Sequence, residues 1–325
     1  MSHLRSSNFL DEGALVSWQG LVYLFLGPFE SLPDVKKHLA DIGVQHFFDP
    51  ASAPFKATDV LKMSPDQFVS FLEESDEKNQ TNPHFPSLFD PQFEDYEKTY
   101  NEHSQLMKNE GLFKTVPYVF AKFPGPLSIQ LRKKALLNII KMKSPLIPFG
   151  FWNKKEGMMG VTPEILFEKK SDQINSMALA GTRRKSVPIE QLLSDSKLRL
   201  EHQIVVDELV EKWSSFGKVD KSETQILELP SLFHLHTPFR VHLKNHSSSF
   251  DLIKALHPTS AVGLSPFNKW KLLEPLAGQK ERGFYGSPLY FRLGDRHELA
   301  TVCLRLVQWD QNSTRFPVGG GIVNQ

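Results

Sequence analysis

The amino-acid sequence predicts an α+β fold in which strands form the larger share. Eight apolar runs have the length of strands, and between them lie six segments whose apolar residues recur with helical spacing. Runs of strands broken by whole helices indicate α+β layers. The 22 prolines and 25 phenylalanines also favour many chain reversals around a bulky core over a helical bundle.

The predicted strands alternate apolar with polar residues or are apolar throughout. In chain order they cover residues 14–25, 114–123, 147–152, 164–167, 225–229, 239–243, 289–293 and 299–308. The predicted helices cover residues 32–42, 64–74, 93–109, 127–142, 189–215 and 249–256. Several of them open with Ser, Asp or Pro, the residue types that start helices.

Composition limits the classes of function. A chain of 325 residues with 40% hydrophobic and 23% charged residues can bury a full core without disulfide or metal staples. The formal net charge of +1 gives no overall field that attracts a nucleic acid or an anionic membrane, so we expect neither partner and only local binding of anions. Cys303 is the one cysteine, which excludes an internal disulfide and a site of several thiolates.

We expect one domain over residues 1–325. No internal repeat occurs, and the polar, proline-broken stretch 74–90 predicts a surface loop because apolar segments flank it on both sides. A second polar patch, 245–249, predicts a connection between a strand and a helix. The N-terminus has no basic segment that leads into an apolar one, and residues 20–29 are too few to cross a bilayer, so we expect a cytoplasmic protein.

A carboxylate interrupts the apolar face of the predicted helix near residue 200. Leu198, Val205 and Leu209 form an inward stripe, and Glu201 falls on the same face. Because burying an unpaired carboxylate is costly, we expect Glu201 to meet a cation, a metal ion or hydrogen-bond donors. The alternative is an edge position from which Glu201 reaches solvent or pairs with Lys197.

Two further features can bind an anion. The segment 316–325 places three glycines beside an apolar pair, and backbone without side chains lets amide groups approach an anion, although a tight turn or a tail is equally compatible. It contains neither a GxGxxG nor a Walker sequence. Arg305 lies in the apolar run 300–309, where it offers a fork for a carboxylate on a strand face shared with Thr301, Cys303 and Val307. An arginine that faces water on an edge strand is the alternative.

Four histidines suggest a metal site because the first two would share one strand face. With no cysteine nearby and few acidic residues, they match zinc spacings poorly, and we interpret them as ordinary strand and loop histidines. They are His234, His236, His242 and His246.

Several segments, in their order along the chain, resemble the chorismate-utilising enzymes, a family that includes isochorismate, salicylate, anthranilate and aminodeoxychorismate synthases. The resemblance covers residues 110–325 and includes the strand that carries Arg305. Its motifs are GVTPEILF at 160–167, MALAGT at 177–182, EH at 201–202, LHPTSAVG at 256–263, ERGFYGSP at 281–288 and GGGIV at 319–323. Such motifs in the family's order are far more specific than any one of them.

The resemblance implies the family's fold, a single α+β domain with two large antiparallel sheets packed face to face and helices outside. Residues 1–109 would form its variable N-terminal half and residues 110–325 its motif-bearing catalytic part. Family members continue past the glycine segment with a second Mg2+ carboxylate, a lysine for the substrate and a closing helix, which the sequence up to Gln325 does not contain. Leu198, Ser260 and Leu264 also stand where the family usually has an acidic residue, Pro and Gly.

The same resemblance implies a binding site for chorismate, a small dianion. Glu201 would bind Mg2+, which holds the ring carboxylate, and Arg305 and Tyr285 would bind the enolpyruvyl carboxylate. The other substrate-binding residues would be Gly319 and Gly320 through their backbone, His257 beside the ring, and Gly181 and Thr182 in the pocket lining.

Lys114 and Glu164 indicate which family member the chain resembles. Isochorismate and salicylate synthases use a lysine at the position of Lys114 to activate water, and Glu164 matches the acid that protonates the departing hydroxyl. A desolvated lysine can serve as base and a shielded carboxyl as acid. Relatives that use ammonia lack this lysine, and aminodeoxychorismate synthases place a nucleophilic lysine where this chain has Ala180. Without the family, the favoured interpretations are a solvated lysine at the start of a strand and a helix or turn carboxylate after Pro163.

The resemblance therefore implies an Mg2+-dependent isochorismate synthase, an isomerase that acts on chorismate without a glutaminase subunit. The alternatives are a salicylate or anthranilate synthase of the same family, the latter with an ammonia-supplying partner, and a non-catalytic or degenerate chorismate-binding protein.

Overall fold

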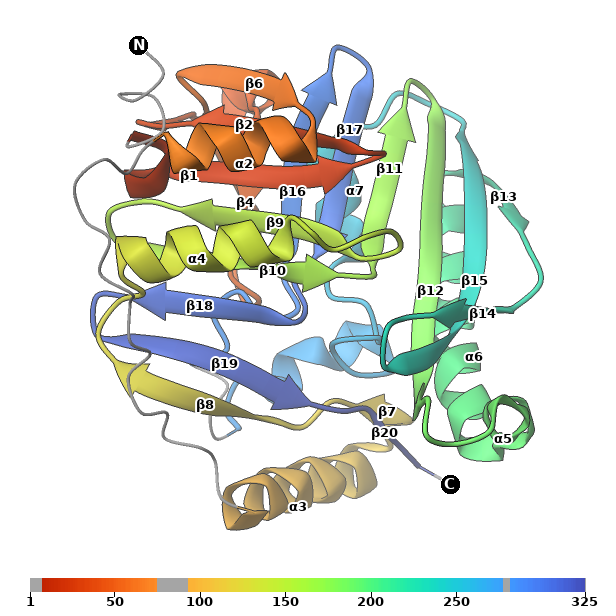
Figure 1. Ribbon diagram of the computed structural model, residues 1–325. Helices are drawn as coiled ribbons and strands as arrows, with labels where there is room; N and C mark the ends of the chain where they lie inside the picture. Colours follow the sequence, from red (N-terminus) through yellow and green to blue (C-terminus); the bar gives the residue numbers. More distant parts are fainter. Residues whose placement is uncertain (1–7, 75–92, 277–280, 325) are drawn as a thin grey trace.

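Two antiparallel sheets form the framework of the molecule (Figure 1). The computed structural model describes residues 8–74, 93–276 and 281–324. Across the eight-stranded sheet the order is β6 (Asp59–Met63), β2 (Leu21–Leu26), β1 (Gly13–Trp18), β9 (Ile147–Trp152), β10 (Glu156–Thr162), β18 (Leu306–Asp310), β19 (Ser313–Gly319) and β8 (Tyr118–Pro124).

The second sheet has ten strands, and its pairings are antiparallel like those of the first. Its order is β13 (Gly217–Lys221), β15 (Leu232–Leu243), β12 (Gln173–Arg184), β11 (Ile165–Lys170), β17 (His297–Val302), β16 (Pro288–Gly294), β4 (Ile42–Val44), β5 (Ala53–Lys56) and β3 (Glu30–Ser31), with β14 (Gln225–Glu228) paired to β15. A separate short pair joins β7 (Lys114–Thr115) to β20 (Ile322–Val323).

The two sheets pack face to face through buried apolar side chains. Phe25 of β2 and Phe291 of β16 are fully buried, with ring centroids 5.5 Å apart. Along β2, Tyr23 and Phe25 belong to this inter-sheet core, whereas Val22 and Leu24 belong to the core on the opposite face. A strand that is buried on both faces is apolar throughout, which accounts for the continuous apolar run in the sequence.

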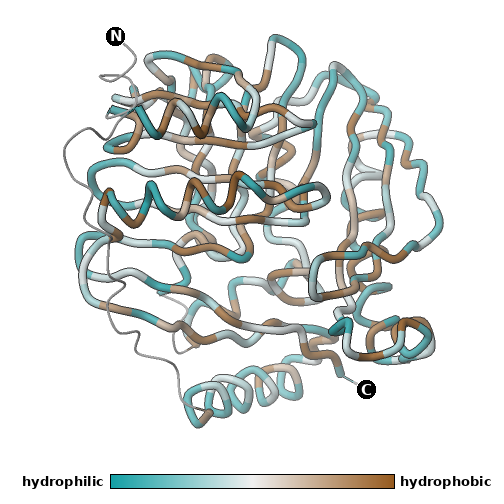
Figure 2. The backbone as a smooth tube through the Cα atoms, in the orientation of Figure 1, coloured by the Kyte–Doolittle hydropathy of each residue, from teal (hydrophilic) through white to brown (hydrophobic). Residues whose placement is uncertain are grey.

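Helices cover the outer faces of the sheets. α2 (Pro65–Glu73) and α4 (Ile129–Ile139) lie on the eight-stranded sheet, and α6 (Ser196–Ser214) and α7 (Ser249–Leu256) lie on the ten-stranded sheet (Figure 1). Figure 2 shows hydrophobic and hydrophilic residues alternating along α4, as expected for a helix with one buried face. Further described helices are η1 (Asp34–Leu39), α3 (Phe93–Glu110), α5 (Ile189–Ser194) and η2 (Phe267–Leu273).

The structure confirms the predicted α+β class and the face-to-face sheets. Residues before 110 contribute β1, β2 and β6 to one sheet and β3, β4 and β5 to the other, so the limit at residue 109 is not a structural boundary. This sharing supports the proposal of one domain. The connection predicted at 245–249 joins β15 to α7, and the loop predicted at 74–90 lies, from residue 75 on, outside the described residues.

Some predicted elements are wrong in their extent. The strand predicted at 299–308 is two strands in different sheets, because Arg305 between them has a left-handed φ of +48°. The helix predicted at 189–215 is α5 and α6, separated at Asp195, whose side chain accepts a hydrogen bond from the Leu198 N–H and caps α6. The helix predicted at 32–42 is only the short η1, and β12 was not predicted.

None of the helices in the described ranges combines the length and apolar character of a membrane span.

Candidate functional site

The candidate site lies where the chain passes twice between the two sheets. The first passage leads from β10 to β11 and contains Glu164, and the second leads from β17 to β18 and contains Arg305. The passages lie side by side, since the Val302 N–H donates to the Glu164 carbonyl oxygen (3.1 Å) and the Val161 N–H donates to that of Arg305 (3.3 Å). Residues distant in sequence therefore meet at this corner.

A cavity of about 320 Å³ opens at this corner. The volume is at the lower end of the range for small-molecule pockets. Seven predicted site residues line it, and they are Glu164, Thr182, Glu201, Tyr285, Arg305, Gly319 and Gly320.

Lys114 lies next to the cavity with its side chain fully buried. Its Nζ donates to the carbonyl oxygens of Ser260 (2.6 Å) and Ala261 (3.2 Å) and lies 3.8 Å from Glu201 Oε1. Burial lowers the pKa of Lys114, and the neighbouring carboxylates, Glu201 first, oppose this shift. The lowered pKa favours a neutral amine, which is able to accept a proton.

Glu164 is a second buried ionisable group of the site. Burial raises its pKa to about 8, against the opposing effect of the Lys114 charge. The Glu164 N–H donates to Thr162 Oγ1 (3.2 Å), which holds the turn between the two sheets. The carboxyl is therefore protonated at neutral pH, so the site combines an acid and a base whose pKa values are shifted toward their neutral forms.

Glu201 meets the amino group of Lys114, whose Nζ lies 3.8 Å from Oε1, so a nitrogen group lies beside this carboxylate as expected. Its side chain is 12% exposed and lines the cavity. A Cβ on Gly321 would lie 2.1 Å from Glu201 Oε1, so any other residue at this position would require the carboxylate to move.

Two glutamates line this corner. Because Glu164 is protonated, Glu201 is the one that offers a carboxylate to a metal ion. The described ranges hold no group of three or more His, Cys, Asp or Glu residues arranged for a metal ion. Mg2+ commonly binds one or two carboxylates and completes its shell with water and substrate oxygens. The carboxylate of Glu201, which lines the cavity, fits a Mg2+ ion held in this way.

Arg305, His234 and Thr182 form a hydrogen-bonded chain along the cavity wall. Arg305 Nη2 lies 2.9 Å from His234 Nε2, and His234 Nδ1 lies 2.9 Å from Thr182 Oγ1. Because a guanidinium only donates, Nε2 accepts, and the ring proton is on Nδ1, from which it is donated to Thr182. Burial lowers the pKa of His234 to about 4, which agrees with a neutral ring. Arg305 itself is exposed, so a carboxylate in the cavity can reach it.

The family model for chorismate binding enzymes matches residues 42–325. The chain belongs to the chorismate binding enzyme family. Isochorismate synthase MenF from Bacillus subtilis (strain 168) is 33% identical over 217 residues, which cover 62% of this chain and 44% of that protein. Isochorismate synthase EntC from Escherichia coli (strain K12) is 29% identical over 177 residues, which cover 51% and 45%. The match thus spans less than half the length of these curated relatives.

The fold of this chorismate binding enzyme agrees with solved structures of the family. A crystal structure of Bacillus anthracis DhbC, to which 2,3-dihydroxybenzoate-specific isochorismate synthase activity is attributed, gives a TM-score of 0.76 at 20% identity. The superposition covers 99% of this chain and 93% of DhbC. The likeness extends over both sheets, so it supports the face-to-face architecture described above.

The structure places His257 away from the cavity of this chorismate binding enzyme. His257 does not line it; its Nε2 lies 2.8 Å from the Phe47 carbonyl oxygen, and its ring packs edge-on against Phe47. The expectation that His257 lies beside the substrate is therefore not supported, and His234 occupies the wall instead. The sequence contains one indication that His234 shares a strand face with another histidine, because alternation along 233–243 places His234 and His236 on the same face.

Glycines shape two parts of the wall. Gly181, which we expected in the pocket lining, does not line the cavity itself. It has φ of +72° at a register shift in β12, and a Cβ there would lie 2.9 Å from the Leu198 carbonyl oxygen. This bulge precedes Thr182, which contacts His234. The Gly320 N–H donates to the Pro117 carbonyl oxygen (3.2 Å), so this amide is engaged within the protein.

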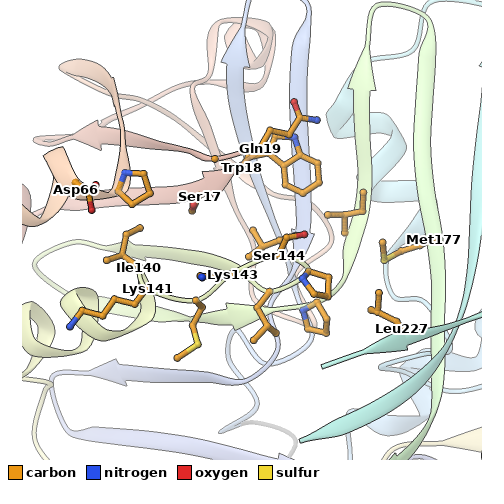
Figure 3. Close-up of a pocket in the computed structure, with 18 of the residues that line it drawn as sticks. Ser17, Trp18, Gln19, Asp66, Ile140, Lys141, Lys143, Ser144, Met177 and Leu227 are labelled. Carbon is orange, nitrogen blue, oxygen red and sulfur yellow. The ribbon is translucent and has the colours of Figure 1, made fainter. Parts of the chain in front are cut away.

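A second cavity, of about 910 Å³, lies on the other side of Pro163, which lines both. Figure 3 shows Trp18, Met177 and Leu227 around it, and most of its lining is apolar. None of the predicted site residues lines this cavity, and its lysines are exposed to solvent. A family that binds the dianion chorismate requires fixed cations and donors, so the smaller cavity is the candidate active site.

Proposed function

We propose that this protein is an isochorismate synthase, an isomerase that converts chorismate into isochorismate. One observation carries the proposal: a buried carboxyl with a raised pKa, that of Glu164, lines the cavity, and a buried lysine with a lowered pKa, Lys114, lies directly beside it, 3.8 Å from the cavity-lining Glu201. The similarity to MenF and EntC, both named isochorismate synthases, supports the same reaction.

Lys114, as the neutral amine, accepts a proton from a water molecule while the water oxygen bonds to a carbon of the substrate ring. The ring double bonds shift, the C–O bond of the original hydroxyl breaks, and Glu164 gives its proton to that hydroxyl, which leaves as water. Transfer of one proton from Lys114 to Glu164 restores the starting state. Because the nucleophile is water, the reaction needs no ammonia-supplying subunit.

The two carboxylates of chorismate account for the cations of the site. Arg305 and the Tyr285 hydroxyl bind the enolpyruvyl carboxylate, and Thr182 and the backbone at Gly319 line the rest of the pocket. Glu201 would hold Mg2+, and the ion would offset the charge of the ring carboxylate when bound. Burial strengthens the interaction of the Tyr285 hydroxyl, because the surrounding wall of the cavity has a low dielectric constant.

Replacing the proposed base tests this function. Purified protein is incubated with chorismate and Mg2+, and the products are separated by chromatography. We expect the wild type to form isochorismate and Lys114→Ala to lose at least about 100-fold in kcat while still binding chorismate, since general-base catalysis contributes about that much. Lys197→Ala, which removes an exposed lysine on α6, is the control and should keep full turnover.

Other results of this experiment would contradict the proposed base or indicate another function. Undiminished turnover by Lys114→Ala would remove Lys114 as the base. Salicylate as product, or anthranilate formed with added ammonia, would assign the chain to another reaction of the family. Chorismate binding without turnover by the wild type would indicate a non-catalytic binding protein.

A further inference from the structure

Arg282 is a buried cation close to the active-site cavity that the proposed reaction does not use. It belongs to the motif at 281–288, and its side chain has no solvent exposure. The guanidinium carbon lies 3.2 Å from the ring centroid of Phe47, 5.0 Å from that of Tyr118 and 5.6 Å from that of Tyr285. Its Nη1 has no hydrogen-bond partner among the residues that the structure describes.

No carboxylate in the described ranges pairs with this guanidinium. The adjacent Glu281 points elsewhere and pairs with Lys122 (3.8 Å) near the surface. Aromatic faces attract a cation but compensate only part of the cost of removing it from water. A buried charge without a counter-charge is among the least favourable features of a fold, so its presence requires an explanation.

The guanidinium lies directly behind the cavity wall. Its Nε donates to the Tyr285 carbonyl oxygen (3.0 Å) and its Nη2 to the Val262 carbonyl oxygen, and both residues line the cavity. Gly286, with φ of +80°, leaves room for the group, since a Cβ there would lie 3.1 Å from Nη2. The charge is therefore separated from the ligand by one layer of protein, where the dielectric constant is low.

We propose that Arg282 is a positioning and specificity-determining residue of the chorismate site. Its uncompensated charge fixes Tyr285 and provides a positive field behind the wall that favours a ligand with two carboxylates over one with a single carboxylate. The inference rests on the proposed function, because the dicarboxylate is the proposed substrate. The ligand supplies the counter-charge that the described part of the chain does not provide.

The test compares two ligands and three variants. Dissociation constants are measured for chorismate and for a dihydroxycyclohexadiene monocarboxylate that has the same ring without the enolpyruvyl group. We expect Arg282→Met to weaken chorismate binding about tenfold or more and monocarboxylate binding less than about threefold, where tenfold corresponds to about 1.4 kcal/mol. Arg282→Lys, which keeps the charge, should keep the preference for the dicarboxylate.

Arg132→Met is the matched control. Arg132 also lies over an aromatic ring, that of Trp309 (5.3 Å), and donates to backbone carbonyl oxygens, but it does not line the active-site cavity. We expect it to lower stability without changing the ratio of the two dissociation constants. If the role of Arg282 were purely structural, Arg282→Met would likewise lower stability and leave the ratio of the two dissociation constants unchanged.

Equal weakening of both ligands by Arg282→Met, or loss of the preference in Arg282→Lys, would overturn the inference. If Arg282→Met does not fold, the test rests on Arg282→Lys. In that case the ratio of its dissociation constants for chorismate and the monocarboxylate is compared with that of the wild type. A wild type that binds neither ligand contradicts the proposed function, whereas a wild type that binds chorismate with a preference independent of residue 282 contradicts only the role of Arg282.

Discussion

The charge state of the buried pair sets the pH range of the reaction. Burial disfavours the charged form of both side chains, since it raises the pKa of Glu164 to about 8 and lowers the pKa of Lys114. The low dielectric constant of the site thus favours the neutral amine and neutral acid that the proposed reaction needs. We expect turnover to fall as the pH rises through about 8, because an ionised Glu164 cannot protonate the departing hydroxyl.

Glu164→Gln removes this titration and keeps the shape of the side chain. The folded-state pKa of Glu164 lies above its unfolded value, so its contribution to stability is full below about pH 4.5 and is lost as the pH rises through about 8. We expect the free energy of unfolding of Glu164→Gln, relative to wild type, to increase on the order of a few kcal/mol between about pH 4 and pH 9. Urea unfolding at both pH values measures this change, and a constant difference would contradict the raised pKa.

At the scale of elements, α6 holds the loop that positions Lys114. Lys212 Nζ donates to the carbonyl oxygens of Leu256 (2.7 Å) and Pro258 (3.0 Å) and pairs with Glu208 Oε1 (2.8 Å). Glu208 Oε2 accepts from the Ser260 N–H (2.9 Å), and the Ser260 carbonyl oxygen accepts from Lys114 Nζ. The helix therefore supplies Glu201 to the cavity and, two turns later, an ion pair that fixes its wall.

Glu208→Ala should destabilise the fold by about 3–5 kcal/mol, because it leaves the Lys212 charge buried without its partner. Chemical denaturation measures the loss. Glu211→Ala, at an exposed position of the same helix, should change stability by less than about 0.5 kcal/mol. The double variant Glu208→Ala/Lys212→Met should recover part of the loss, and strict additivity of the two single effects would show that the pair is not coupled.

Local signals in the sequence predicted the helices better than the strands. Ser64, Ser128 and Ser248 cap α2, α4 and α7 with their side chains, and a cap acts within its own turn, so it can be recognised without the fold. The break at Arg305 depends on which sheet each flanking strand joins, and the run 300–309 contains no information about those partners.

The same limit applied to the site. Thr182 and Glu201, which the family motifs indicated, line the cavity, and so does His234, whereas His257 contacts Phe47 instead. The two histidines differ in their three-dimensional neighbours, which their local sequence does not reveal. Arg282 could not be recognised as buried from its sequence, since arginines are usually exposed. Only the packed structure shows that no carboxylate of residues 8–74, 93–276 and 281–324 pairs with it.

At the scale of the whole molecule, the inter-sheet core holds the two walls of the site at a fixed separation. Apolar side chains of both sheets fill this core, and aromatic pairs such as Phe25 and Phe291 connect them. Close packing resists sliding of one sheet on the other. The positions of Glu164 and Arg305 thus depend on side chains that never contact a ligand.

Phe291→Ala should lower the free energy of unfolding by about 3–5 kcal/mol, the usual cost of truncating a buried phenylalanine. Thermal unfolding measures the effect. Phe93→Ala, at a position 74% exposed, is the control and should change stability by no more than about 0.5 kcal/mol. Equal stability of the two variants would show that the core between the sheets does not support the fold.

Glu164 and Arg305 both lie on connections of a few residues, outside the paired strands. Substitutions in such connections alter reactive groups without removing any hydrogen bond of the strand ladders on either side. Proteins that share this fold can therefore acquire a different chemical reaction through a few substitutions in these connections. The rest of the sequence can change as long as the protein still folds.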